Sequence, residues 1–111
     1  PSGLPFTPIA PSSKDDLVLA EGFSYEVLIK FKDKINATEF FGAHNDYLHF
    51  VPINKSQEHG LLWVNHEYLH PVLFHERRMD IPRTKEDVIQ EQLGLGGSII
   101  EVQKINGSWK W

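Results

Sequence analysis

The chain has 111 residues, of which 41% are hydrophobic and 23% are charged, and its formal net charge is −4. This composition is typical of a folded globular protein. The mild acidity excludes a broad basic surface for nucleic acid, so an anionic substrate would need bound cations or a local arginine cluster. The chain contains no cysteine, which excludes disulfides, thiolate metal ligands and cysteine nucleophiles. No stretch approaches the ~20 apolar residues needed to cross a bilayer.

Residues 1–14 are expected to form an extended leader of a single region that spans residues 1–111. Four prolines in the first eleven residues disfavour both a helix and a central strand. The leader lacks the basic and apolar segments of a signal peptide, so we expect no export signal within this chain. Residues 15–111 are expected to form strands and one helix.

Residues 22–31 alternate apolar and polar side chains, with Phe23, Tyr25, Val27, Ile29 and Phe31 on one face. This period of two predicts a half-buried β-strand. The polar stretch at 32–46 predicts a long loop. Residues 47–53 and 60–68 are apolar runs rich in aromatic and β-branched residues, and they predict an antiparallel hairpin.

A helix is predicted after Thr84, which is followed three residues later by Asp87 in the pattern of a capping box. The glycines from Gly94 onward predict its end. We expect Val88, Ile89 and Leu93 to form its buried stripe. The sequence then predicts a second hairpin that turns at Asn106-Gly107. Because the chain ends inside that second strand, we expect it to be a fragment of a longer protein.

The segment His66-Glu67-Tyr68-Leu69-His70 matches the H-E-x-x-H pattern of zinc proteases. That chemistry requires a helix, since only then do both imidazoles reach one ion. The apolar run before His66 favours a strand, and Pro71 disfavours a helical conformation at His70. We therefore rank a zinc metalloprotease as a distant third interpretation.

Several oxygen-bearing side chains flank the predicted hairpin. Asn65 and Glu67 lie two positions apart at the end of a strand, so they point the same way. Asn45 and Asp46 immediately precede the first strand. Carboxylate and amide oxygens are hard ligands that suit calcium, although such residues commonly serve only turns or solvent. One segment is locally basic. It either binds phosphate through bidentate arginine hydrogen bonds or is a solvated loop, and it contains His70, His75, Arg77 and Arg78.

The succession of segments resembles the N-terminal part of the PhoX family of bacterial alkaline phosphatases. The pieces that carry the resemblance are "EGFSYEVLIKF", "GAHNDYLHFVPI", "LLWVNHEY", "GGSIIEV" and the terminal "GSWKW", in this order. The most specific of them are "LLWVNHEY" and "GGSIIEV". The resemblance covers nearly the whole chain.

The resemblance implies a mainly β fold of antiparallel hairpins with one short helix, forming one to two blades of a β-propeller. It also implies hydrolysis of phosphate monoesters at a cluster of calcium and iron ions in an exported, periplasmic or extracellular protein. The partners would be the phosphate-monoester substrate and the remainder of the same propeller, with no nucleic acid and no membrane span. By position, Glu67, Asn65 and Asp46 are the candidate metal ligands, and His66 and Asn45 are expected beside the metals or the phosphate.

One departure limits the resemblance: the cysteine that binds iron in the family has no counterpart in this chain. We therefore expect no catalytic residue and no complete cofactor site within these 111 residues, and an inactive fragment. The alternative is a non-catalytic β-rich binding or interaction module on the same scaffold.

Overall fold

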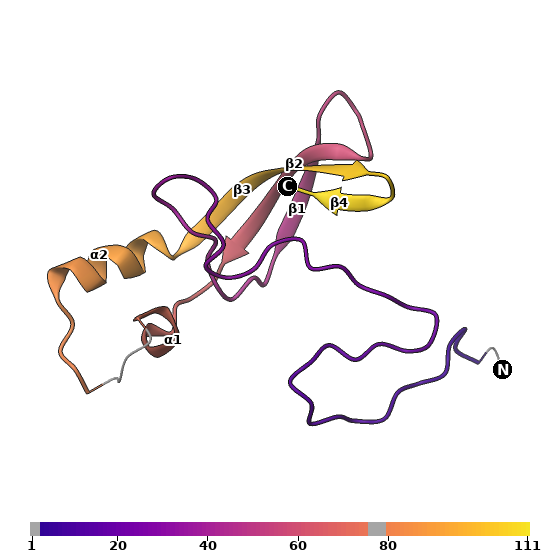
Figure 1. Cartoon of the computed structure of the whole chain (residues 1–111), viewed down its shortest axis with the longest axis horizontal. Helices are drawn as coiled ribbons and strands as arrows, with labels where there is room; N and C mark the ends of the chain where they lie inside the picture. Colours follow the sequence, from indigo (N-terminus) through magenta and orange to yellow (C-terminus); the bar gives the residue numbers. More distant parts are fainter. Residues whose placement is uncertain (1–2, 76–79) are drawn as a thin grey trace.

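The computed structural model describes residues 3–75 and 80–111. Its centre is an antiparallel sheet of four strands in the order β1-β2-β3-β4 (Figure 1). The strands are β1 (Leu48–Pro52), β2 (His59–His66), β3 (Gly96–Ile105) and β4 (Ser108–Lys110). Both predicted hairpins, β1–β2 and β3–β4, are confirmed, and β2 pairs with β3 along its whole length to join them.

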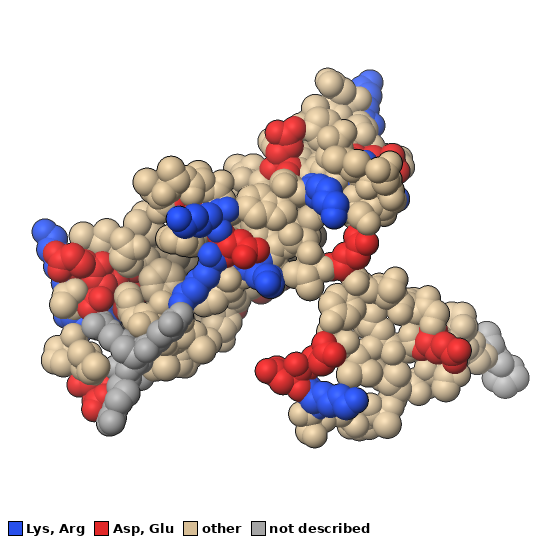
Figure 2. All heavy atoms as spheres, in the orientation of Figure 1, with Lys and Arg blue, Asp and Glu red and all other residues tan. Residues whose placement is uncertain are grey.

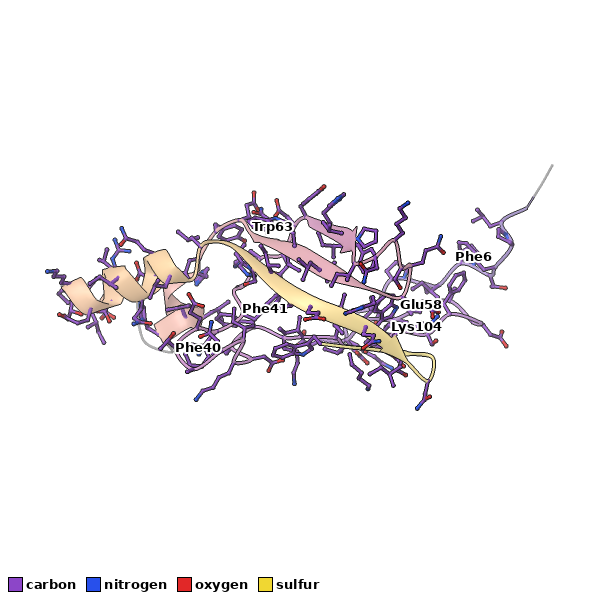
Figure 3. All side chains as sticks on the ribbon, turned by 90° about the horizontal axis from the view of Figure 1, so that it is seen from above. Phe6, Phe40, Phe41, Glu58, Trp63 and Lys104 are labelled. Atoms are coloured by element: carbon purple, nitrogen blue, oxygen red, sulfur yellow. The ribbon has the colours of Figure 1, made fainter. Side chains whose placement is uncertain are left out.

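The two faces of the sheet differ in burial. The pairing of Leu62 with Ile100 and of Gly60 with Val102 places one set of side chains on the same face. The buried apolar core lies there, and it consists of Phe41, Val64, Ile100 and Val102. The opposite face carries exposed apolar side chains, including Leu61, Trp63 and Ile99. Figure 3 shows Phe41 and Trp63 on opposite sides of the sheet.

The sharp turn between β3 and β4 follows from its two residues. Asn106 and Gly107 have φ values of 50° and 86°. Positive φ at both central positions is the type I′ turn, whose twist matches that of the flanking strands and which Asn-Gly favours. Asn54 and Lys55 also have positive φ in the β1–β2 connection, which Ile53 N–H closes by donating to the His59 carbonyl at 3.0 Å.

Helix α2 (Lys85–Leu93) begins as predicted. The Thr84 hydroxyl accepts from the Asp87 N–H and the Asp87 carboxylate accepts from the Thr84 N–H, which completes a capping box. Gly94 caps the other end. The predicted apolar stripe is wrong, because Val88, Ile89 and Leu93 are all exposed.

The buried residue of α2 is instead Glu91. Its carboxylate accepts from Arg83 at 2.6 Å and contacts His75 Nε2 at 3.0 Å. A buried carboxylate is tolerable only when paired in this way. His75 ends α1 (Pro71–His75), a five-residue helix that the sequence did not predict. Proline is favoured at the first position of a helix, which explains why α1 begins at Pro71.

The strand predicted at residues 22–31 is wrong: this segment is extended but belongs to no sheet among the described residues. Phe23, Tyr25 and Val27 are 58%, 49% and 62% exposed. The segment leads from the N-terminal part of the chain to the sheet (Figure 1), and the radius of gyration of 18.1 Å exceeds the ~13 Å expected for a compact chain of this length. The segment touches β4, where Ser108 Oγ donates to Glu26 Oε1 at 2.9 Å, but among the described residues no strand pairs with its backbone, and alternation forms a sheet only with such a partner.

The loop predicted at 32–46 is confirmed as irregular. It folds back on itself through the isolated bridge between Lys34 and Phe40, and its end brings Phe41 under the sheet. Among the described residues, no helix has the length and apolarity that a membrane crossing requires.

Candidate functional site

The candidate site lies where β2 ends, and it comprises Asn45, Asp46, Asn65 and Glu67, which we call the β2 rim. Two backbone hydrogen bonds extend the β1–β2 ladder past β1: Asn65 N–H donates to the Tyr47 carbonyl at 2.8 Å, and Glu67 N–H donates to the His44 carbonyl at 3.0 Å. The loop before β1 is thereby fixed against the end of β2.

Two side-chain hydrogen bonds join the predicted site residues. Asn65 Nδ2 donates to Asp46 Oδ1 at 2.6 Å, and His66 Nδ1 lies 2.8 Å from Asn45 Oδ1. The structure therefore brings together Asp46 with Asn65 and Asn45 with His66. Glu67 is joined to the loop through its backbone, and its carboxylate is exposed. The metal-binding roles of Asp46, Asn65 and Glu67 remain predictions.

The β2 rim fits calcium in the type of its donors but not in their number. Asp46 and Glu67 offer carboxylate oxygens and Asn65 an amide oxygen, the hard ligands that calcium prefers. Calcium takes 6–8 oxygen ligands, and the described residues contain no group of three or more His, Asp or Glu placed to hold an ion. These residues can supply only part of a metal site, so no reaction step is derived through one.

His66 is the buried centre of the region, with 4% of its surface exposed. Its ring lies against the edge of Phe41, with centroids 4.9 Å apart at 90°. Burial lowers the pKa of His66, because the charged imidazolium loses solvation, and a hydrogen bond to the Ala43 backbone carbonyl partly opposes the shift. The imidazole is therefore held neutral at physiological pH.

Two residues around His66 were missed by the sequence reasoning. Ser98 on β3, which is 7% exposed, places its Oγ 2.8 Å from His66 Nε2. Gly42 lies so close that an added Cβ would be 2.5 Å from His66 Cγ. The signal for Ser98 was available: in β3 it stands two residues before Ile100 and four before Val102, so the alternation places a polar residue on the buried face. Nothing in the sequence signals Gly42 before the fold is known.

His44 is a third neighbour of the rim. It adopts a left-handed backbone with φ of 52°, and its ring stacks on Tyr68 with centroids 3.7 Å apart. Its Nε2 atom is buried and has no hydrogen-bond partner among the described residues. Such an atom carries a desolvation cost that a partner would remove.

A groove of about 400 Å³ runs beside β3, and Ser98 and His66 contribute to its wall. Glu39 and Glu101 are its acidic lining residues, and none of the described lining residues is Lys or Arg. The groove is therefore unsuited to an anion without added cations. Figure 2 shows Lys, Arg, Asp and Glu side chains on the same face of the molecule, without the single-sign patch that would bind a polyanion.

The structure excludes the zinc-protease interpretation. His66 ends β2, residues 67–70 are irregular, and α1 begins only at Pro71. The two histidines of the pattern therefore do not share a helical face. In the basic segment, His75 pairs with Glu91 of α2, whereas Arg77 and Arg78 lie outside the described residues.

Comparison with known proteins identifies the family. The family model described as "Alkaline phosphatase PhoX" matches residues 4–111. The chain belongs to the PhoX alkaline phosphatase family. The comparison with curated protein sequences found no match.

Among solved structures, the chain is similar to Pseudomonas fluorescens PhoX in complex with vanadate, a transition state analogue. The TM-score is 0.80 and the sequence identity is 25%, over 95% of this chain and 21% of that one. The chain thus spans about a fifth of the length of this relative. The mainly β fold class and the resemblance to PhoX, both predicted from the sequence, are confirmed.

Proposed function

We propose that this chain is part of a metal-dependent phosphatase that hydrolyses phosphate monoesters. The observation that carries the proposal is the PhoX family match over nearly the whole chain. The similar Pseudomonas fluorescens protein was solved with vanadate, described as a transition state analogue, which supports phosphoryl chemistry for this chain as well. The 111 residues alone are expected to be inactive, because they contain no complete site.

The proposed cofactors are calcium and iron. Bound cations would supply the positive charge that a chain of net charge −4 lacks, and they would polarise the phosphoryl oxygens. Asp46, Asn65 and Glu67 would hold part of the cluster, with calcium the better match for their oxygen donors. The role of this chain in the reaction is then to orient these oxygens at the end of β2, while Asn45 and His66 hold the loop that carries Asp46.

The proposed partner of this chain is the remainder of the same β-propeller. A four-stranded antiparallel sheet in sequential order is the unit that forms one propeller blade, and β1–β4 have this order. Leu61, Trp63 and Ile99 leave one face of the sheet apolar and exposed. An adjoining blade would cover such a face. We further propose that the protein is exported to the periplasm or outside the cell, as the family resemblance implies.

The test uses the full-length product of the gene that encodes this chain. Purified protein is assayed for hydrolysis of p-nitrophenyl phosphate before and after EDTA treatment, and calcium and iron are measured by mass spectrometry. The proposal predicts hydrolysis that EDTA abolishes and that calcium and iron together restore. A metal-free protein that folds and hydrolyses no phosphate monoester would contradict it and favour the non-catalytic binding module.

A further inference from the structure

A continuous chain of polar contacts connects β3 to the β2 rim through the interior of the protein. Ser98 Oγ lies 2.8 Å from His66 Nε2, and His66 Nδ1 lies 2.8 Å from Asn45 Oδ1. Asn45 directly precedes Asp46, whose carboxylate accepts from Asn65. Ser98 has no assigned role, yet it stands at the buried end of this chain of contacts.

The chemistry of the three side chains fixes the direction of the hydrogen bonds. The Oδ1 atom of Asn45 can only accept, so the proton of the neutral imidazole must be on Nδ1. His66 Nε2 then has a lone pair and no proton, and it must accept. Among the described residues, the donor in contact with it is the Ser98 hydroxyl. The Oδ1 atom of Asn45 thus selects the tautomer, and the Ser98 hydroxyl, which can donate or accept, satisfies the other ring nitrogen.

Two neighbours restrict the position of the His66 ring. Phe41 presents its edge to the ring, and Gly42 passes so close that even a methyl group would overlap the His66 ring. Because these contacts restrict the ring, loss of its hydrogen bond to Ser98 should weaken its hydrogen bond to Asn45. Outer partners of this kind orient metal-binding groups in many sites.

We propose that Ser98 is a positioning residue: its hydroxyl pairs with His66 Nε2 and holds the ring toward Asn45, which thereby sets the Asp46 carboxylate over the end of β2. The part of this inference that concerns calcium rests on the proposed function. The hydrogen bonds and the placement of the loop do not depend on it.

The decisive comparison is between two substitutions in the full-length protein, Ser98→Thr and Ser98→Val. Threonine and valine have nearly the same shape and both suit a strand, but only threonine keeps the hydroxyl. Ser108→Ala on β4 is the control, because its hydroxyl bonds to Glu26, away from the rim. Hydrogen exchange of the peptide that covers residues 42–46 is followed by mass spectrometry, and calcium affinity is measured by titration calorimetry.

The expected result is that Ser98→Val accelerates exchange in residues 42–46 by up to about tenfold, the range of one hydrogen bond. Its calcium affinity should fall by about 10–100-fold, as for other partners that orient metal ligands. Ser98→Thr and Ser108→Ala should match the unaltered protein. Equal behaviour of the threonine and valine variants would overturn the proposal, since volume rather than the hydroxyl would then matter.

Failure of the proposed function has a different outcome. If the unaltered protein binds no calcium and hydrolyses no phosphate monoester, the proposed function is wrong and Ser98 has no role in calcium binding. The exchange difference between Ser98→Thr and Ser98→Val still decides whether Ser98 positions the loop.

Discussion

Residues 23–31 and strand β3 carry the same kind of sequence pattern but have different structures. Residues 23–31 alternate apolar and polar side chains except at Leu28, and β3 does so from Ile100 to Gln103. In β3 the alternation becomes a buried row, and Val102 is 2% exposed. In the N-terminal segment Val27 is 62% exposed, and among the described residues no strand pairs with the segment.

The difference shows what a period of two does and does not establish. The period specifies which side chains share a face, whereas pairing depends on a second strand that satisfies the backbone and covers the face. Strand β3 has such neighbours in β2 and β4. The segment at 23–31 has an apolar row and a side-chain hydrogen bond from Ser108 of β4 to Glu26, but its backbone pairs with no strand among the described residues.

The largest expected effect comes from placing a charged residue in the buried row of β3 and, for comparison, in the apolar row at residues 23–31. In the 111-residue chain, Val102→Asp buries an unpaired carboxylate and should cost roughly 4 kcal/mol or more of the free energy of unfolding, enough to lose the sheet. Val27→Asp should change it by less than about 0.5 kcal/mol. Urea unfolding followed by circular dichroism measures both. Equal losses in the two variants would contradict the contrast between the regions.

A second pair of variants compares glycines. Gly42→Ala forces a methyl group against the His66 ring and should lower the free energy of unfolding by about 1–3 kcal/mol. Gly3→Ala is the control, because an added Cβ there has no atom within 4 Å. Both values come from urea midpoints at constant slope. A Gly42→Ala variant as stable as the control would show that the ring can move.

A third comparison, with a smaller expected effect on stability, removes one hydroxyl that accepts a backbone hydrogen bond from each region. Thr84→Ala removes the side-chain acceptor of the Asp87 N–H and should cost about 1 kcal/mol. Ser12→Ala removes a similar contact to the Lys14 N–H in the N-terminal segment, where no helix depends on it, and should cost less than about 0.5 kcal/mol. Thermal unfolding measures the two differences. A larger loss of stability in Ser12→Ala than in Thr84→Ala would contradict the account.

The smallest effect concerns a local contact within the N-terminal segment. The Tyr25 hydroxyl donates to Asp16 Oδ1 at 3.1 Å, and this hydrogen bond to a carboxylate raises the Tyr25 pKa above its ordinary value. Asp16→Asn should return the pKa toward 10.0, because the negative charge that opposes ionisation is lost. The phenolate absorbance during a pH titration measures the shift. Asp15→Asn is the control and should leave the titration unchanged.

The parts of the fold that follow from local chemistry were predictable from the sequence. Asn106-Gly107 specified its turn, and Thr84 with Asp87 specified the start of α2, since both depend on neighbouring residues alone. The buried stripe of α2 was not predictable in this way. Glu91 became the buried residue because Arg83 and His75 meet its carboxylate, and such pairing depends on how α1 packs against α2.

The residues of the candidate site were proposed from the sequence and stay a prediction, whereas the residues that support them came only from the structure. The strand period placed Asn65 and Glu67 on one side, and the structure adds the bond from Asn65 to Asp46 that no spacing could give. His66 and Asn45 were expected beside the site, and they form a hydrogen bond with each other. Ser98 and Gly42 come from other parts of the chain, so their contacts with His66 exist only once β2, β3 and the loop are assembled.

The most direct test of the account is the calcium content of the full-length protein with Glu67→Gln, compared with Glu58→Gln. Glu58 is an exposed glutamate near Lys104, with 3.6 Å between Oε1 and Nζ, and Figure 3 shows this pair far from Phe41. The account predicts that Glu67→Gln loses bound calcium and phosphatase activity together, whereas Glu58→Gln keeps both. Full calcium content and activity in Glu67→Gln would contradict a metal-binding role for the β2 rim.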